Sequence, residues 1–164
     1  MKKVPLMLGI ALTVLCLCQS TFSQDGNADH RKLIQASHFL EEKPLDKDAK
    51  AIRNWAFVWA ADTKDVTVII CGVGGPFMDK KVKFGGELMA QYAIAMTAFK
   101  LENPDKASDE NAAQLAGVES ALKVYQILVK DNPKGKAYGV EALIAKRDKG
   151  ELPAYVATSD CGKK

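Results

Sequence analysis

The clearest regular pattern of apolar positions lies between residues 115 and 129. Five large apolar side chains recur there at alternating intervals of three and four residues, which places them on one face of an α-helix. They are Leu115, Val118, Leu122, Tyr125 and Val129. Ser108 is a suitable N-cap, followed by Asp109 and Glu110 at the positive end of the helix dipole. We therefore expect a long helix that begins at Ser108 and ends at Asn132-Pro133.

Two helices are expected in the first third of the chain. The first covers about 29–42, where Asp29 can cap its start. The second begins at Asp46 or Asp48 and continues to about Ala61. One face of this second helix carries Ile52, Trp55 and Trp59.

Two more helices are expected further along. One is opened by Gly85-Gly86 and stopped at Asn103-Pro104, with apolar residues at helical spacing between these points. The last covers about 136–149 and has basic residues in its final turn, which suits the negative end of a helix dipole. Gly150 is a plausible residue to end it.

Residues 66–71 form a short apolar run whose secondary structure the pattern leaves open. The run is rich in β-branched side chains, which favour strands, and Val82 and Phe84 could supply a partner strand in a small hairpin at about 66–84. The alternative is a buried helix capped by Asp65. We favour the helix, because the segments on both sides are helical.

These elements predict an all-α fold. Five to six helices joined by short connections favour antiparallel neighbours and hence a compact bundle. The length after the leader suits one domain, which we place at residues 24–164 with short flexible ends.

The N-terminus has the three parts of a secretory signal peptide. Lys2 and Lys3 precede an uncharged apolar run over 4–17, and small and polar residues follow. We expect cleavage after Ser23, with Ser20 as the second choice. The chain also contains no Asn-x-Ser/Thr sequence, which fits a bacterial envelope better than a eukaryotic surface. The protein is therefore expected to be exported, to the periplasm or the medium.

Two cysteines remain after the leader, Cys71 and Cys161. An even number of cysteines in an exported protein indicates a disulfide. The bridge would close a loop of about 90 residues and contribute about 4–5 kcal/mol in the chain-entropy description. A buried Cys71 with a free thiol at Cys161 is the alternative.

Composition and charge exclude several classes of protein. Apolar residues make up 48% of the chain and charged residues 26%, which is typical of a folded globular protein. Residues 1–23 hold two of the 23 basic residues and none of the 20 acidic ones, so the remainder has a net charge of +1. This balance does not favour nucleic acid as a partner, and we expect no stable membrane insertion once the signal is removed.

Motifs for catalysis, cofactors and metals are absent from the sequence. His30 and His38 are the only histidines, and on one helix they would lie about 12 Å apart, too far to share a metal ion. The glycines at 72–75 lack the third glycine of a dinucleotide loop, since that position is Phe77. We therefore assign no catalytic, cofactor-binding or metal-ligating residue, and interpret 72–75 as a turn between core elements.

Five aromatic residues form the candidate apolar cluster. They fall at helical spacing, which is typical of core packing but also suits a pocket for an apolar ligand. They are Trp55, Trp59, Tyr92, Phe99 and Tyr125.

A short stretch resembles the second helix of a tetratricopeptide repeat. The small, aromatic, apolar and proline positions of that helix are matched by Ala121, Tyr125, Leu128 and Pro133. The resemblance covers about 13 residues and implies stacked helix pairs as an alternative architecture.

The sequence thus favours an exported helical module that binds a protein or a small apolar ligand. One alternative is a small envelope enzyme whose site is assembled only in three dimensions, with His38 as the candidate base. Another is a structural envelope protein that associates with itself through a symmetric face.

Overall fold

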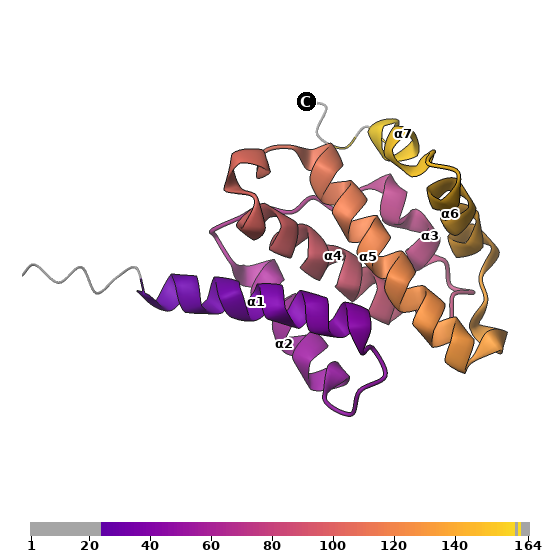
Figure 1. Cartoon of the computed structure of the whole chain (residues 1–164), viewed down its shortest axis with the longest axis horizontal. Coiled ribbons are helices and arrows are strands. Elements are labelled where there is room, and N and C mark those ends of the chain that lie inside the picture. Colours follow the sequence, from indigo (N-terminus) through magenta and orange to yellow (C-terminus); the bar gives the residue numbers. More distant parts are fainter. Residues whose placement is uncertain (1–23, 160, 162–164) are drawn as a thin grey trace, which may run out of the picture.

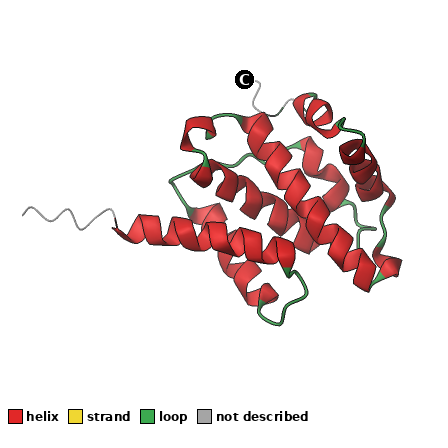
Figure 2. Cartoon of the chain, viewed as in Figure 1, coloured by secondary structure: helices red, strands yellow, loops and turns green. Residues whose placement is uncertain are grey.

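The computed structural model describes residues 24–159 and residue 161. The expected signal peptide and its cleavage sites lie outside the described residues. Figure 2 shows that the described part consists of helices and loops, with no strand in it. The prediction of an all-α fold is confirmed.

Seven α-helices occur in the described residues, joined in places by short 3₁₀ turns. They are α1 (Gln24–Glu42), α2 (Ala49–Asp62), α3 (Gly75–Met78), α4 (Gly85–Glu102), α5 (Glu110–Asp131), α6 (Tyr138–Asp148) and α7 (Leu152–Ala157). The expected number was five to six. Helices α3 and α7 were missed because they contain 4 and 6 residues, too few for a periodic pattern.

Helices α4 and α5 pack against each other in the middle of the molecule (Figure 1). Helices α1 and α2 lie on one side of this pair, and α3, α6 and α7 lie on the other. Two apolar cores follow from this arrangement: a larger one around Tyr92, Leu122 and Tyr125, and a smaller one around Leu33, Leu40 and Ile94.

The helix boundaries agree in part with the expected ones. Helix α5 is capped by Asp109 rather than Ser108, and its carboxylate accepts a hydrogen bond from the amide of Ala112 at 3.0 Å. Gly150, expected to end α6, has a φ of 73°. Its amide donates to Arg147 O and that of Glu151 donates to Lys146 O, which is the Schellman arrangement.

Residues 66–71 are neither the expected helix nor the alternative strand of a hairpin. The segment lies between α2 and α3 without helix or strand pairing, and Figure 1 shows it as an extended stretch that passes α4. The prediction was wrong because side chains from α4 and α5 take two of its carbonyl groups, as described below, in place of a backbone ladder.

Helices α4 and α5 approach each other closely at Gly117 of α5. A Cβ atom at this position would lie 2.7 Å from Met96 Cγ, 2.7 Å from Tyr92 Cδ2 and 2.8 Å from Tyr92 O. Real Cβ contacts of this length are essentially never seen, so the α4–α5 crossing requires glycine here. The packing of the two central helices is therefore decided by one missing methyl group.

A buried amide joins three helices near this crossing. Gln91 of α4 donates from Nε2 to the backbone carbonyl of Ser37 on α1, at 3.1 Å, and to the hydroxyl of Ser120 on α5, at 2.8 Å. Gln91 is fully buried. These bonds fix the position of α1 on the central pair, because an apolar contact alone would not specify one register.

Tyr125 makes the corresponding polar contact on the α6 side. Its hydroxyl donates to Glu141 and accepts from the amide of Ala137, each at 2.8 Å. Burial raises the pKa of Tyr125 to about 12, and Glu141 acts in the same direction, while the Ala137 amide opposes it. Burial likewise raises the pKa of Tyr92 to about 12.

Replacing Gly117 by alanine should destabilise the protein. The added methyl group forces Tyr92 and Met96 to move, and overpacking of this kind costs roughly 1–3 kcal/mol. Gly86→Ala is the matched control, since a Cβ at Gly86 meets no atom within 4 Å. Urea unfolding of both variants measures the difference. Equal stability of the two variants would show that the crossing has room for the methyl group.

Raising the pH from about 10 to about 12 should also destabilise the fold. Both buried tyrosines have a raised pKa, so the folded state holds these protons more tightly than the unfolded state. Their stabilisation is complete below the unfolded pKa near 10 and is lost as the pH approaches 12, by roughly 2–3 kcal/mol for each. Tyr125→Phe should therefore show a smaller loss between pH 9 and pH 12 in urea unfolding. If the stability of this variant depended on pH as that of the unmodified protein does, the raised pKa of Tyr125 would be contradicted.

Candidate functional site

The five aromatic residues of the candidate cluster do not meet in one pocket. Tyr92 and Tyr125 are fully buried in the larger core, whereas Trp55 and Trp59 are half-buried against the smaller one. Phe99 of α4 is also half-buried. Of the five, Trp55 lines an open groove.

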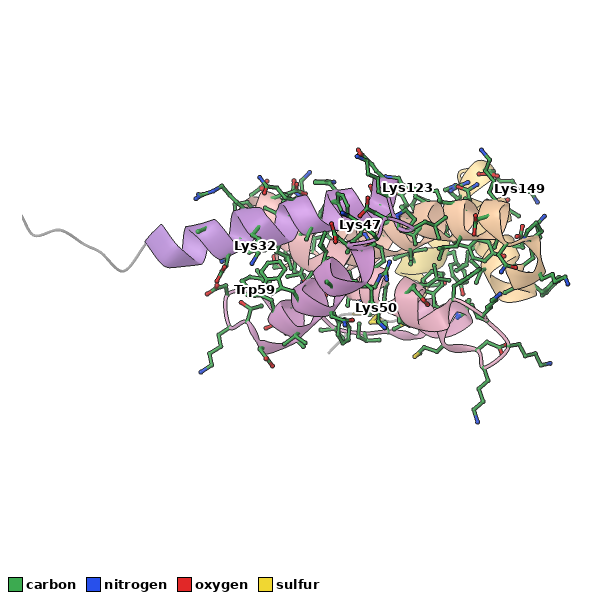
Figure 3. The ribbon with its side chains drawn as sticks, turned by 90° about the horizontal axis from the view of Figure 1, so that it is seen from below. Lys32, Lys47, Lys50, Trp59, Lys123 and Lys149 are labelled. Carbon is green, nitrogen blue, oxygen red and sulfur yellow. A yellow bond between two sulfur atoms is a disulfide. The ribbon has the colours of Figure 1, made fainter. Side chains whose placement is uncertain are left out.

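This groove lies between α1 and α2 and has a volume of about 400 Å³. Its lining is apolar apart from a lysine and a glutamine: Lys32, Gln35, Ala36, Phe39, Ala51, Ile52 and Trp55. Each of its two aromatic rings has a lysine over it, with Lys32 Nζ 3.9 Å from the Trp55 ring and Lys43 Nζ 5.9 Å from the Phe39 ring. Figure 3 shows Lys32 on the side of α1 that faces α2. We refer to it as the α1–α2 groove.

His30 and His38, the two histidines, each pair with a carboxylate. His30 Nε2 lies 2.8 Å from Asp65 Oδ2, and its ring meets Trp59 edge-on at 5.8 Å. The hydrogen bond from His30 lowers the pKa of Asp65. His38 Nε2 lies 2.9 Å from Glu102 Oε1, with 58% of the His38 side chain exposed. Water therefore reaches the His38 pair freely.

Large apolar side chains of α2 and of the segment 66–70 are exposed. Four of them are exposed by 43–57%: Phe57, Val58, Ile69 and Ile70. A hollow of about 290 Å³ lies beside the segment. It is lined by residues of α2, of the segment and its approach, and of α4: Phe57, Ala60, Ala61, Thr63, Val66, Thr67, Val68, Ile70 and Ala93.

A further hollow of about 680 Å³ follows on the same face of α2. Lys50, Arg53 and Asn54 line it, together with residues at the start of α4 that include Glu87. Both hollows include Phe57, and the α2 residues of both fall three or four positions apart, which is one face of a helix. We call the two hollows together the α2–α4 groove.

The segment 66–70 is held in place by two buried side chains. Lys100 of α4 donates from Nζ to Thr67 O at 2.6 Å and forms an ion pair with Glu110 of α5. Gln114 of α5 donates from Nε2 to Ile69 O and accepts a hydrogen bond from the hydroxyl of Tyr92. Lys100 and Gln114 are 3% and 0% exposed, so the central helices bury polar groups in order to hold this loop.

The end of the segment is fixed by the Cys71–Cys161 disulfide, as the sequence predicted. The two Cα atoms are 5.8 Å apart, and the bridge ties the residues after α7 to the middle of the chain. Gln114 Nε2 also lies 3.3 Å from Cys71 Sγ. Side chains from α4 and α5 therefore hold the middle of the segment, and a covalent bond holds its end.

The glycines that follow are a turn between core elements. Gly72–Gly74 form a 3₁₀ turn, and Gly75 and Pro76 begin α3. A Cβ at Gly74 would lie 3.0 Å from Tyr92 Cε1, so this glycine allows the turn to pack on the core.

Within residues 24–159 and 161, no three histidine, cysteine or acidic side chains gather where they could hold a metal ion. No helix in this part of the chain combines the length and the apolar character needed to cross a membrane.

Neither groove could be recognised in the sequence. Each is lined by residues of α2 together with residues of α1, of α4 or of the loop, so its lining comes from distant positions. The one available signal was the β-branched run 66–70 itself, of which the structure leaves Thr67, Ile69 and Ile70 exposed.

Replacing Lys100 by methionine should strongly destabilise the protein. The change removes the ammonium group that pairs with the Glu110 carboxylate. One oxygen of that carboxylate is already buried without a hydrogen-bond partner among the described residues. Removing one partner of a buried pair costs about 3–5 kcal/mol. The double variant Lys100→Met/Glu110→Met should regain most of this loss in urea unfolding. Additive losses in the double variant would show that the pair is not coupled.

Comparison with known proteins gives no match to the chain among protein-family models, curated proteins or solved structures. The tetratricopeptide resemblance therefore receives no support from these comparisons, and the site is interpreted from its own geometry.

Proposed function

We propose that the protein is an exported binding module that takes up a peptide segment of a protein partner in the α2–α4 groove. The observation that carries the proposal is that Phe57 and Ile70, two exposed apolar side chains from α2 and from the segment 66–70, line the same hollow. Apolar side chains gathered on a surface, with a concavity next to them, are typical of an interaction site.

The way the segment 66–70 is held supports a binding role. Two buried polar side chains and a disulfide keep these apolar residues at the surface, although folding would gain free energy from burying them. A surface that is both apolar and rigid binds with a small loss of conformational entropy.

Catalysis receives less support than binding. The candidate base His38 lies in an exposed pair with Glu102, where water is not excluded. General acid–base catalysis needs the base to converge with other polar groups around a substrate.

The proposed location rests on two features. The N-terminal pattern is that of a secretory signal, and the Cys71–Cys161 disulfide suits an oxidising compartment. We place the protein in the periplasm or the medium, with a bacterial envelope favoured.

Selection from a random library of eight-residue peptides tests this proposal. Protein exported by cells that express the full chain should select peptides that bind it. Ala61→Trp fills the hollow beside the segment 66–70 and should weaken these peptides at least tenfold in fluorescence anisotropy. We expect Ala51→Trp to leave their affinity within about twofold.

Ala51→Trp is the matched control because Ala51 is also an exposed alanine on α2 but lines the α1–α2 groove. Loss of binding in Ala51→Trp alone would move the site to that groove. Failure to select any peptide would reject the proposed function.

A further inference from the structure

We propose that the partner segment binds as an added β-strand along residues 66–70, and carries an acidic group at the end that reaches Lys50 and Arg53. This inference rests on the proposed function and deepens it, because it names the conformation and the charge of the bound segment.

The backbone of the segment 66–70 resembles the edge of a sheet. Among the described residues, no backbone–backbone hydrogen bond uses an amide or carbonyl of residues 66–70. Thr63 and Cys71, on either side, have extended dihedral angles. The stretch therefore has the properties of a sheet edge that has no neighbouring strand.

The backbone groups of these residues point in alternate directions. In an extended chain, the amide and carbonyl of alternate residues point to opposite sides. The carbonyls of Thr67 and Ile69 point toward Lys100 and Gln114. The amides and carbonyls of the alternating residues Val66, Val68 and Ile70 therefore point to the other edge of the segment, away from Lys100 and Gln114.

The hollow lies against one face of the segment, and Phe57, Ala60 and Ala61 of α2 also line it. An extended peptide that pairs along the free edge of the segment would direct alternate side chains to this same face, toward the hollow and the apolar face of α2. Strand addition of this kind uses backbone bonds for affinity and side-chain contacts for specificity.

The far end of the α2–α4 groove is charged. Beyond Phe57, the groove is lined by two cations, Lys50 and Arg53, and by one carboxylate, Glu87. Burial lowers the pKa of Arg53, and the Glu87 carboxylate opposes that shift. An acidic group of the ligand would act in the same sense as Glu87, so charge complementarity selects an anionic end.

Two synthetic peptides test the charge part of the proposal. Both contain alternating valine and threonine over six residues; one has a glutamate at its N-terminal end and the other at its C-terminal end. Each is compared with the same peptide in which lysine replaces the glutamate. One of the two glutamate peptides should bind at least tenfold more tightly than its lysine version. The end that carries the preferred glutamate gives the direction of the bound strand. Lys50→Glu should remove that preference, whereas Lys47→Glu should not.

Lys47 is the matched control because it is exposed like Lys50, three positions earlier, and is not part of the groove lining (Figure 3). Equal affinity of the acidic and lysine peptides for the unmodified protein would overturn the charge assignment.

Hydrogen exchange measured by NMR tests the strand itself. Binding of the preferred peptide should slow exchange at the amides of Val66, Val68 and Ile70 by at least tenfold, and leave Thr67 and Ile69 nearly unchanged. Two further peptides carry N-methyl groups on alternate amides, one at the odd-numbered residues and the other at the even-numbered residues. Binding should be abolished in one of these peptides and kept in the other, because only alternate amides of an added strand face the segment.

The outcomes separate this inference from the proposed function. Peptides that bind in the α2–α4 groove but protect all five amides, or none of them, would overturn the strand and keep the function. Failure of both synthetic peptides and of the library to bind would overturn both.

Discussion

The fold depends on the close approach of α4 and α5 at Gly117. Because this residue has no side chain, Tyr92 and Met96 of α4 lie directly against the backbone of α5. Tyr92 is then in position to bond to Gln114, and Gln91 to Ser120. A wider separation would break both polar contacts and open the larger core.

The loop 66–71 shows how such a scaffold can hold apolar residues at a surface. A loop of this composition would normally collapse onto the core or form a hairpin. Lys100 and Gln114 prevent this by bonding to alternate carbonyls, and the ion pair with Glu110 supplies the counter-charge for the buried lysine. Buried polar groups cost free energy unless they are satisfied, and here the loop backbone satisfies them.

The two grooves on α2 differ in what they offer a ligand. The α1–α2 groove presents aromatic rings with lysines over them, which suits a compact apolar contact with an anionic neighbour. The α2–α4 groove adds a backbone edge, which side chains alone cannot imitate. Because backbone pairing fixes both the conformation and the register of a bound segment, this second groove offers the more specific recognition.

The sequence by itself determined the helical class, the main helices, the stop at Gly150 and the Cys71–Cys161 pairing. These features depend on local spacing, on capping chemistry and on the number of cysteines, all of which can be seen along one stretch of chain. Only the tertiary structure decided the conformation of residues 66–71 and the positions of Trp55 and Tyr92 in separate cores. The β-branched run lost both its expected helix and its alternative strand because Lys100 and Gln114, distant in the sequence, took its carbonyl groups. The grooves were hidden for a related reason: their walls combine residues of α1, α2, α4 and the loop that are distant in the sequence, and no local pattern encodes how these elements pack.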